Sequence, residues 1–231
     1  MKILKHLRSD WFRYGFETIA VVVGILIAFA LDNWKDERKQ QELELKTLIE
    51  LKNALDSDLE DIIQNASRHK NAQNACELLI DYMDNDLPYH DSLARHFGYI
   101  SDMTVFLPHI GPYETLKTKG LDLISHDSIR LHLSEYHEED IKLALTVEGL
   151  NLSNIPDIRQ LHFRHFEEWL FLGPAIPYNY ELLKADLEFM SYLKHTASAR
   201  GYESKMFSQR IGPKCRSLIH DIEEEIERRS R

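Results

Sequence analysis

The sequence is poor in residues that crosslink a small fold or break a helix. Its two cysteines, Cys76 and Cys215, are too few for a disulfide scaffold or a zinc finger. Both fall in stretches with a helical pattern, so we expect two small buried thiols. A bridge between them is the alternative if the domain lies outside the cytoplasm. The 9 glycines and 7 prolines are sparse and clustered, and none lies between Leu26 and Leu87. This distribution favours long helices over a sandwich of short strands.

Positive charge is also in deficit. The chain has 28 Lys and Arg residues against 38 Asp and Glu residues, a net charge of −10. This balance argues against nucleic acid as a partner and against a basic surface that binds anionic lipid. A hydrophobic content of 43% excludes wholesale disorder, and 231 residues are enough for one membrane helix and one domain of ordinary size.

Sequence motifs of catalysis are missing as well. There is no Gly-rich phosphate loop, nucleophile elbow or Cys-His dyad signature, and no Glu is followed three residues later by His. We therefore expect no cofactor and no catalytic residue, although a metal enzyme with a site built across helices stays an alternative. The best metal pair is His162 and His165, with Glu168 one helical turn further on. Because His165 also fits an apolar stripe with Trp169, a buried, hydrogen-bonded histidine is the commoner interpretation.

One long apolar run is present, and no second run follows it. No charged residue lies between Thr18 and Leu31, and extending the run back to Tyr14 adds only Glu17. A run of this length without charge is typical of a helix that crosses a bilayer. The sequence therefore predicts a single membrane-spanning helix over residues 14–34.

The residues that flank the run fit the same prediction. At about 1.5 Å per residue, a helix from Trp11 to Trp34 covers about 34 Å, which matches a hydrocarbon core about 30 Å thick with an indole at each interface. Arg13 precedes Glu17 by four residues, so the two can pair near the headgroups. Gly24 and Ala28 have the spacing that lets two membrane helices approach closely. The expected membrane or oligomer contacts are Trp11, Arg13, Glu17, Gly24, Ala28 and Trp34.

A cleaved signal peptide is the alternative to a retained anchor. The run follows a basic leader, and Ala28-Phe29-Ala30 has the small-x-small form that a signal peptidase accepts. Against this, no helix breaker precedes Ala28, and the helical pattern continues past Trp34. Retention of the anchor is therefore favoured.

The membrane helix divides the chain into four predicted parts. These are a short basic leader (1–13), the membrane helix (14–34), a stalk with the first bundle helix (35–87), and the remaining bundle helices (88–231). Four basic residues lie on each side of the span, but the far side opens with several acidic ones. We expect a bacterial inner-membrane protein with a cytoplasmic N-terminus and a periplasmic helical domain.

The stalk leads into a long amphipathic stretch. Apolar residues recur every three or four positions at Leu45, Leu48, Leu51, Leu55, Leu59, Ile62 and Ala66, and the stripe goes on through Gln73, Cys76, Ile80 and Met83. The spacing is too irregular for a long isolated coiled coil and favours a bundle. The predicted fold class is therefore all-α, with a membrane helix continuing into a stalk helix and an extramembrane helical bundle.

Residues 88–150 are predicted from their breakers and caps. We expect short helices over 92–100 and after Pro112, the second one ending at Gly120 with a left-handed backbone. Ser125 or Asp127 is the expected cap of the next helix. Its apolar stripe consists of Ile129, Leu133, Tyr136, Leu143, Val147 and Leu150.

The C-terminal third is predicted as helices separated by proline. One helix begins near Pro156 and continues to Leu172, where residues 173–177 force a turn. Asn179 caps the last long helix, which Gly201 and the 212–213 pair bend or split. The expected buried face comprises Leu183, Leu187, Met190 and Leu193, then Leu218, Ile219, Ile222 and Ile226, with residues 223–225 opposite.

Two stretches together resemble a known family. The first is Glu17 with Gly24-Ile25-Leu26-Ile27-Ala28 and Asn33-Trp34, and the second is Tyr113-Glu114-Thr115-Leu116-Lys117 followed by Gly120 and Leu123-Ile124. Over residues 16–140 the chain resembles an uncharacterised family of bacterial single-pass envelope proteins. Lys119 departs from the family pattern, which has a small polar residue there. The resemblance implies a membrane helix and a helical exterior domain, and it implies no activity.

The second stretch has two interpretations. It can be a helical corner that packs Leu116, Leu121 and Ile124 into the bundle. It can also be a recognition surface formed by Tyr113, Glu114, Lys117, Lys119 and Gly120.

The expected function is that of a membrane-anchored interaction or scaffold protein. Its expected partners are the lipid bilayer and either a second copy of the chain or a larger membrane complex. A helical ligand-binding or sensory domain that relays its signal through a partner is the alternative.

Overall fold

The computed structural model describes the backbone of residues 3–230 and the side chains of residues 15–229. The chain divides into two units, Met1–Thr47 and Leu48–Arg231, which are treated separately below. The first helix, α1 (Ile3–Asp84), contributes residues to both units. It is helical without interruption across the Gly- and Pro-free stretch that predicted it. It ends where Asp86 takes a positive φ of 55°, two residues before Pro88.

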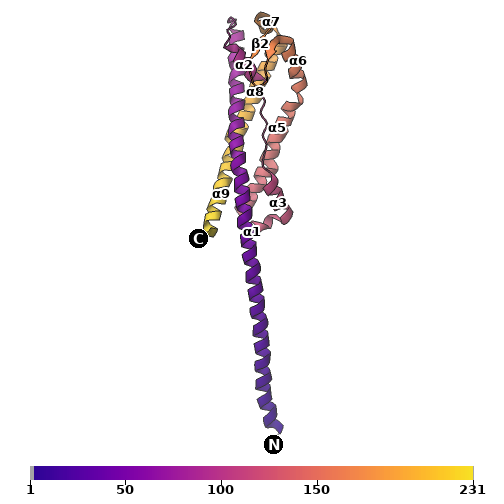
Figure 1. The fold of residues 1–231 in the computed structure, drawn as a ribbon, viewed down its shortest axis with the longest axis vertical. Helices are drawn as coiled ribbons and strands as arrows, with labels where there is room; N and C mark the ends of the chain where they lie inside the picture. The colour runs from indigo at the N-terminus through magenta and orange to yellow at the C-terminus, as the bar shows by residue number, and fades with distance from the viewer. Residues whose placement is uncertain (1–2, 231) are drawn as a thin grey trace. The chain divides into compact units, whose positions relative to one another are not determined.

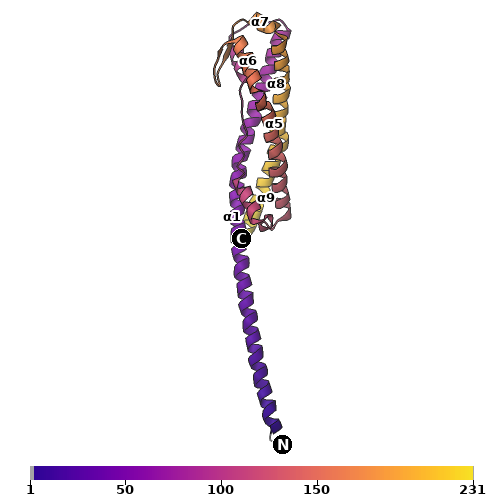
Figure 2. The ribbon, with the colours of Figure 1, turned by 90° about the vertical axis from the view of Figure 1, so that its right-hand side faces the viewer.

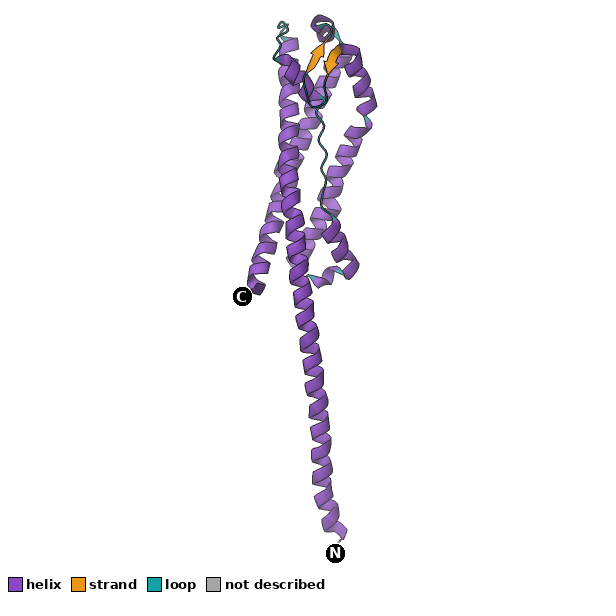
Figure 3. Ribbon diagram, viewed as in Figure 1, coloured by secondary structure: helices purple, strands orange, loops and turns teal. Residues whose placement is uncertain are grey.

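The second unit contains the remaining elements, which Figures 1 and 3 show to be almost entirely helical. Up to residue 165 they are α2 (Leu93–Ile100), α3 (Gly111–Lys119), the 3₁₀ turn η1 (Leu121–Leu123), α4 (Asp127–Glu135), the π-helical turn η2 (Tyr136–Asp140), α5 (Ile141–Ser153) and α6 (Ile155–His165). Then come β1 (Phe166–Trp169), β2 (Ala175–Pro177), α7 (Tyr180–Ala185), α8 (Leu187–Lys205), the π-helical turn η3 (Met206–Ile211) and α9 (Gly212–Ser230). The all-α prediction is confirmed.

Three long helical segments form the bundle of the second unit. They are residues 48–84 of α1, the α4–η2–α5 segment and the α8–η3–α9 segment, and Figure 2 shows the last two side by side. The chain returns between α2 and α3 through residues 102–110, an extended segment without regular secondary structure. This segment and the helices around it carry the polar groups discussed below.

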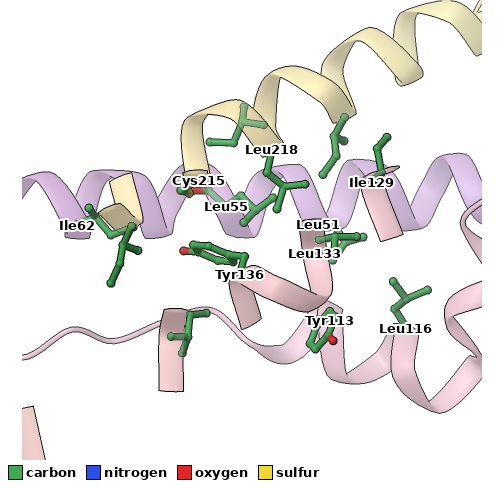
Figure 4. Packing of buried hydrophobic residues seen from close by; sticks show 14 of the residues in the cluster. Leu51, Leu55, Ile62, Tyr113, Leu116, Ile129, Leu133, Tyr136, Cys215 and Leu218 are labelled. Atoms are coloured by element: carbon green, nitrogen blue, oxygen red, sulfur yellow. The ribbon is translucent and has the colours of Figure 1, made fainter. Parts of the chain in front are cut away.

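Two apolar clusters form the core of the second unit. One joins α1 to α3, α4, α9 and the two π turns, and Figure 4 shows its members Leu51, Leu55, Ile62, Tyr113, Leu116, Ile129, Leu133, Tyr136, Cys215 and Leu218. The other surrounds Phe97, which contacts the rings of Phe166 and Phe189. Cys76 lies in the second cluster and Cys215 in the first, and both are free thiols. The expectation of two buried, unbridged cysteines is confirmed.

The extended segment 102–110 is held by side-chain carboxylates rather than by a neighbouring strand. Asp61 accepts a hydrogen bond from the backbone N–H of Leu107 at 2.9 Å, and Glu148 accepts one from Phe106 at 3.0 Å. Asp58 accepts a hydrogen bond from the backbone N–H of His109 at 2.7 Å. These bonds satisfy backbone donors that a loop against a helical core would otherwise leave unpaired.

The two π turns change which residues face the core. Because η2 inserts an extra residue into its helix, the buried face after Tyr136 moves to Asp140, Ala144 and Glu148. The predicted stripe was therefore wrong at Leu150, which is 66% exposed. The turns lie against each other, since Arg210 of η3 donates from Nε to the buried Asp140 at 2.8 Å.

Gly201 and the 212–213 pair do not split the last helical segment. The segment continues through η3, where the backbone N–H of Gly212 donates to the carbonyl of Phe207 five residues earlier, just before Pro213. A π turn removes the clash that a proline makes with the preceding turn of a regular helix. Gly201 instead allows close packing, because an added Cβ would lie 2.9 Å from the Gln73 side chain.

The helix predicted up to Leu172 was wrong. It ends at His165, and β1 pairs with β2 as an antiparallel hairpin. Phe166 and Trp169 both reach the core, although they are three residues apart, because the strand alternation is interrupted by a register shift between Phe166 and Glu168. Residues 173–177 supply the turn and the second strand, in which Ala175 is buried. Glu168 therefore does not lie one helical turn beyond His165.

Local predictions near the helix ends had mixed outcomes. Asn179 caps a helix through a hydrogen bond from Leu182, but this helix is the short α7, and the long helix that it was predicted to cap begins separately as α8, with Asp186 as its cap. His126, rather than Ser125 or Asp127, caps α4, since its Nδ1 faces the backbone N–H of Ile129. Leu187, predicted on the buried face, is 85% exposed because Asp186 begins a new helix there. Glu225, predicted on the face opposite the apolar stripe, is buried and accepts hydrogen bonds from Arg228 and Arg229.

Candidate functional site

The apolar run of α1 is exposed within the first unit. Among the described residues, α1 contains one stretch that is long and apolar enough to cross a membrane, with an 18-residue window of mean hydropathy 2.0 and none of it buried. Glu17, Gly24, Ala28 and Trp34 all lie on this exposed surface, and an added Cβ at Gly24 would meet nothing within 4 Å. The side chains of Trp11 and Arg13 lie outside the described residues, so the expected pairing of Arg13 with Glu17 is not described.

The stretch around α3 is mainly a packing corner. Leu116 and Ile124 are fully buried, and Gly120 has a φ of 104°, as the packing interpretation predicts. The Tyr113 ring is not displayed as the recognition interpretation expected: it is 2% exposed and stacks on His137 at 4.1 Å between centroids. The residues left at the surface there are Glu114, Lys117 and Lys119.

Lys117 joins this corner to η2. Its Nζ lies 3.2 Å from Glu114 and 2.8 Å from Glu138, and these two carboxylates raise its pKa. The side chain also lies over the Tyr113 ring at 5.5 Å. The positive charge of Lys117 is therefore paired with carboxylates of the same domain.

His162 and His165 do not converge on one point. The Nδ1 atom of His162 lies 2.8 Å from the carbonyl of Ile158, and its ring is buried and stacked on Trp169 at 4.6 Å. His165 instead pairs with Asp186 through Nε2 at 2.7 Å. Among the described residues, no group of three or more His, Cys, Asp or Glu side chains could hold a metal ion.

The second unit contains a cavity of about 430 Å³. It is lined by the end of α2, the start of the extended segment, the α5–α6 junction, the β1–β2 hairpin and the middle of α8. Its apolar walls include Ile100, Ile158, Leu161, Trp169 and Tyr192. This volume and this mixture of apolar walls with a few polar groups are typical of small-molecule sites.

The polar end of the cavity is organised by Arg200. Its Nη1 lies 3.4 Å from Glu203 Oε2, and its Nη2 donates to the backbone carbonyl of Asp102 at 3.3 Å. Asn151 donates to the other oxygen of Glu203 at 2.7 Å. Arg200 and Glu203 are 8% and 1% exposed, so this ion pair is largely removed from bulk water.

His69 of α1 contacts both members of this ion pair. Its Nδ1 lies 3.2 Å from Arg200 Nη1 and 3.3 Å from Glu203 Oε2, and the ring stacks on Phe207. Burial and, to a smaller extent, the Arg200 charge lower the pKa of His69 to about 3, so the imidazole is neutral. Burial raises the pKa of Glu203 against the opposing effect of Arg200 and Asn151. A neutral histidine with a paired carboxylate is an arrangement for positioning Arg200 rather than for proton transfer at neutral pH.

Comparison with family models identifies the chain. Residues 17–146, more than half of the sequence, match DUF6090, a family of unknown function. The chain belongs to DUF6090. No curated protein and no solved structure matches it.

The DUF6090 match includes only part of the cavity. It contains the apolar run of α1, His69 and Asp102, whereas Arg200 and Glu203 lie beyond its end. The resemblance to an uncharacterised family, predicted from residues 16–140, is confirmed.

Sequence reasoning missed the residues of the cavity in this DUF6090 protein. One signal was available in α1, where the predicted stripe steps by seven positions, from Ala66 to Gln73, instead of three or four. His69 fills this gap at helical spacing, and it is 1% exposed. No comparable signal marks Asp102 or Arg200, because an extended segment and a helix 98 residues apart bring them together.

Proposed function

We propose that this DUF6090 protein is a single-pass membrane protein whose helical domain acts by binding rather than by catalysis. The observation that carries the proposal is the apolar window of α1, of which none is buried. Exposing large apolar side chains such as Phe16, Leu26 and Phe29 to water along a helix is unfavourable by about 25 cal/mol per Å². A bilayer removes that cost.

The proposal includes the topology expected from the sequence. Residues 14–34 span the bacterial inner membrane, preceded by the leader 1–13, and residues 35–87 and 88–231 form the stalk helix and the rest of the bundle. The N-terminus lies in the cytoplasm and the helical domain in the periplasm. The Gly24–Ala28 face is offered as the contact between two copies, which crosslinking in native membranes tests.

Membrane retention is tested by placing charge in the apolar run. Val23→Lys with Ile27→Lys introduces two lysines, each unfavourable by about 2.5–3.5 kcal/mol at the centre of a span. The double variant is expected in the soluble fraction after alkaline extraction of membranes, while the wild type stays in the pellet. Gln40→Lys with Gln41→Lys adds the same charge outside the run and is the matched control. Loss of the wild type from the pellet would overturn the proposal.

Orientation is tested with reporters fused to the C-terminus. Alkaline phosphatase is active only after export, whereas a fluorescent protein exported unfolded stays dark. A periplasmic domain predicts an active phosphatase fusion and a dark fluorescent one, and the reverse pattern places the domain in the cytoplasm.

The cavity favours a second, more specific function, which is binding of a small molecule. A volume of about 430 Å³ with a buried ion pair at one end is not required by the packing of a scaffold. The test is thermal denaturation of the full-length protein against a panel of small apolar compounds. Ala199→Trp, which fills the cavity, is the control. A stabilising compound should act on the wild type and not on this variant, because a ligand that binds only the native state raises its stability.

A further inference from the structure

The charges around the cavity leave one partly buried carboxylate uncompensated. At the polar end, Arg200 forms an ion pair with Glu203 and donates to the backbone carbonyl of Asp102, not to its carboxylate. Elsewhere along the lining, Asp157 is exposed to water, and Glu188 pairs with Arg164 at 2.7 Å. The neutral His69 adds no charge.

Asp102 is the partly buried carboxylate of this lining that has no partner among the described residues. No donor among the described residues forms a hydrogen bond or ion pair with its side chain, and its Oδ1 is shielded from water. A shielded carboxylate oxygen without a donor is unfavourable, and more so when the group is charged. Asp102 lines the cavity, so a ligand there can supply the missing donor.

The rest of the cavity sets the size and character of such a ligand. A water molecule takes about 30 Å³ in the liquid. If each non-hydrogen atom with its hydrogens takes about the same space, a volume of about 430 Å³ holds about 14 non-hydrogen atoms. Trp169 and Tyr192 supply aromatic walls, and Ile158 and Leu161 supply aliphatic ones. Aromatic rings attract an ammonium group as well as an apolar body.

We propose that this cavity binds a monocationic amine with an aromatic or aliphatic body of about 14 non-hydrogen atoms, its ammonium group donating to Asp102. A carboxylate ligand is disfavoured, because it would place a third anion beside Asp102 and Glu203 while Arg200 is already paired. This inference rests on the proposed ligand-binding role of the cavity and names the chemical class of the ligand.

Three compounds with the same indole body and different end groups test the charge of the ligand. Tryptamine is a cation, tryptophol is neutral and indole-3-propionate is an anion at pH 7. Each is titrated calorimetrically into the full-length protein in nanodiscs, with empty nanodiscs subtracted. Tryptamine is expected to bind with a Kd on the order of 0.1 mM, at least tenfold more tightly than tryptophol, and indole-3-propionate more weakly still.

Asp102→Asn removes the charge while keeping the shape of the side chain. It should weaken tryptamine at least tenfold and leave tryptophol within twofold, so that the preference for the cation disappears. Glu167→Gln removes an exposed charge from β1 outside the cavity and should change neither affinity. Ala199→Trp should abolish binding of all three, and circular dichroism confirms that each variant is folded.

The outcomes separate the two proposals. Equal or tighter binding of tryptophol or indole-3-propionate, or a cation preference that survives Asp102→Asn, overturns the amine assignment and leaves the ligand-binding role standing. Failure of all three compounds to bind also overturns the amine assignment. The ligand-binding role itself is then decided by the compound panel and the Ala199→Trp control.

Discussion

Removing the Asp58 side chain should destabilise the helical domain by releasing the extended segment 102–110. Asp58 is fully buried in α1 and accepts three hydrogen bonds. Oδ1 accepts from the backbone N–H of His109 at 2.7 Å and lies 3.0 Å from its Nδ1, and Oδ2 accepts from the Tyr136 hydroxyl at 3.1 Å. One carboxylate therefore ties the far end of the segment to both α1 and η2.

The magnitude follows from what Asp58→Ala leaves behind. The Tyr136 hydroxyl and the His109 backbone N–H lose their acceptor, at about 1–3 kcal/mol for each shielded donor. The His109 side chain is 55% exposed and can bond to water, so it adds little. We expect a loss of about 3–4 kcal/mol, which corresponds to a fall in Tm of about 6–16 °C for a chain of this size.

The charge itself is not what stabilises the fold. Burial raises the pKa of Asp58 against the opposing effect of its three donors, so the ionised form is disfavoured relative to the unfolded chain. Asp58→Asn, which removes the charge and keeps an acceptor for His109, should therefore lower stability by no more than about 1 kcal/mol. It is the isosteric control.

A double-mutant cycle with Tyr136→Phe checks the mechanism. Tyr136→Phe alone leaves Oδ2 of Asp58 without a donor, and in combination with Asp58→Ala it removes an orphaned hydroxyl. The double variant should therefore be more stable than the sum of the single effects by about 1 kcal/mol or more. Thermal melts of full-length protein in detergent, followed by circular dichroism, give the four values. Additive effects, or an Asp58→Ala variant as stable as Asp58→Asn, would refute the reasoning.

Three other predictions follow from the second unit. Burial raises the pKa of Glu148 to about 7, above its unfolded value, so the native state holds a proton that the unfolded state loses between about pH 4.5 and 7. This contribution to the stability of the wild type is therefore lost as the pH rises. The stability of Glu148→Gln minus that of the wild type should increase by about 1–2 kcal/mol between pH 5 and pH 7.5, after allowance for solvent screening. Thermal melts across that pH range measure this difference. Gly98→Ala should lower stability by about 1–3 kcal/mol, because its Cβ would lie 2.0 Å from the carbonyl oxygen of Gly173, whereas Gly149→Ala, with nothing within 4 Å, should raise it by up to about 1 kcal/mol. Burial raises the pKa of Cys76 and Cys215 to about 12, so neither thiol should react with iodoacetamide at pH 8 until denaturant is added, and rapid labelling of the native protein would contradict the packing.

The position and the buried face of a helix could be predicted where one periodic pattern of apolar residues was enough to define them. The absence of Gly and Pro predicted α1, and its stripe placed Leu48, Leu51, Leu55 and Ile62 in the core, where each is at most 1% exposed. These predictions hold because helical periodicity reports one buried face, whatever packs against it.

The rest of the fold could not be predicted, because it depends on contacts between residues that are far apart in the sequence. The sequence of residues 166–169 has no local feature that ends a helix at His165, and the strand forms because residues 175–177 pair with it. The π turn η2 likewise moves the buried face by one residue and exposes Leu150. The site is still more dependent on tertiary contacts, since Asp102, Asn151 and Arg200 come from separate segments of the chain.

The extended segment links the two features that distinguish this domain from a simple helical bundle. Its first residue, Asp102, presents a carboxylate without a donor to the cavity, and its far end is held by Asp58. Glu148 holds the middle of the same segment at Phe106. Because consecutive backbone groups move together, an ammonium bound at Asp102 would add a further restraint to an extended segment that Asp58, Asp61 and Glu148 already hold. Binding should then stabilise residues 102–110 more than the apolar clusters. Hydrogen exchange can detect this as slowed exchange at Phe106 and Leu107, which would show that the cavity and the carboxylate ties act on one element.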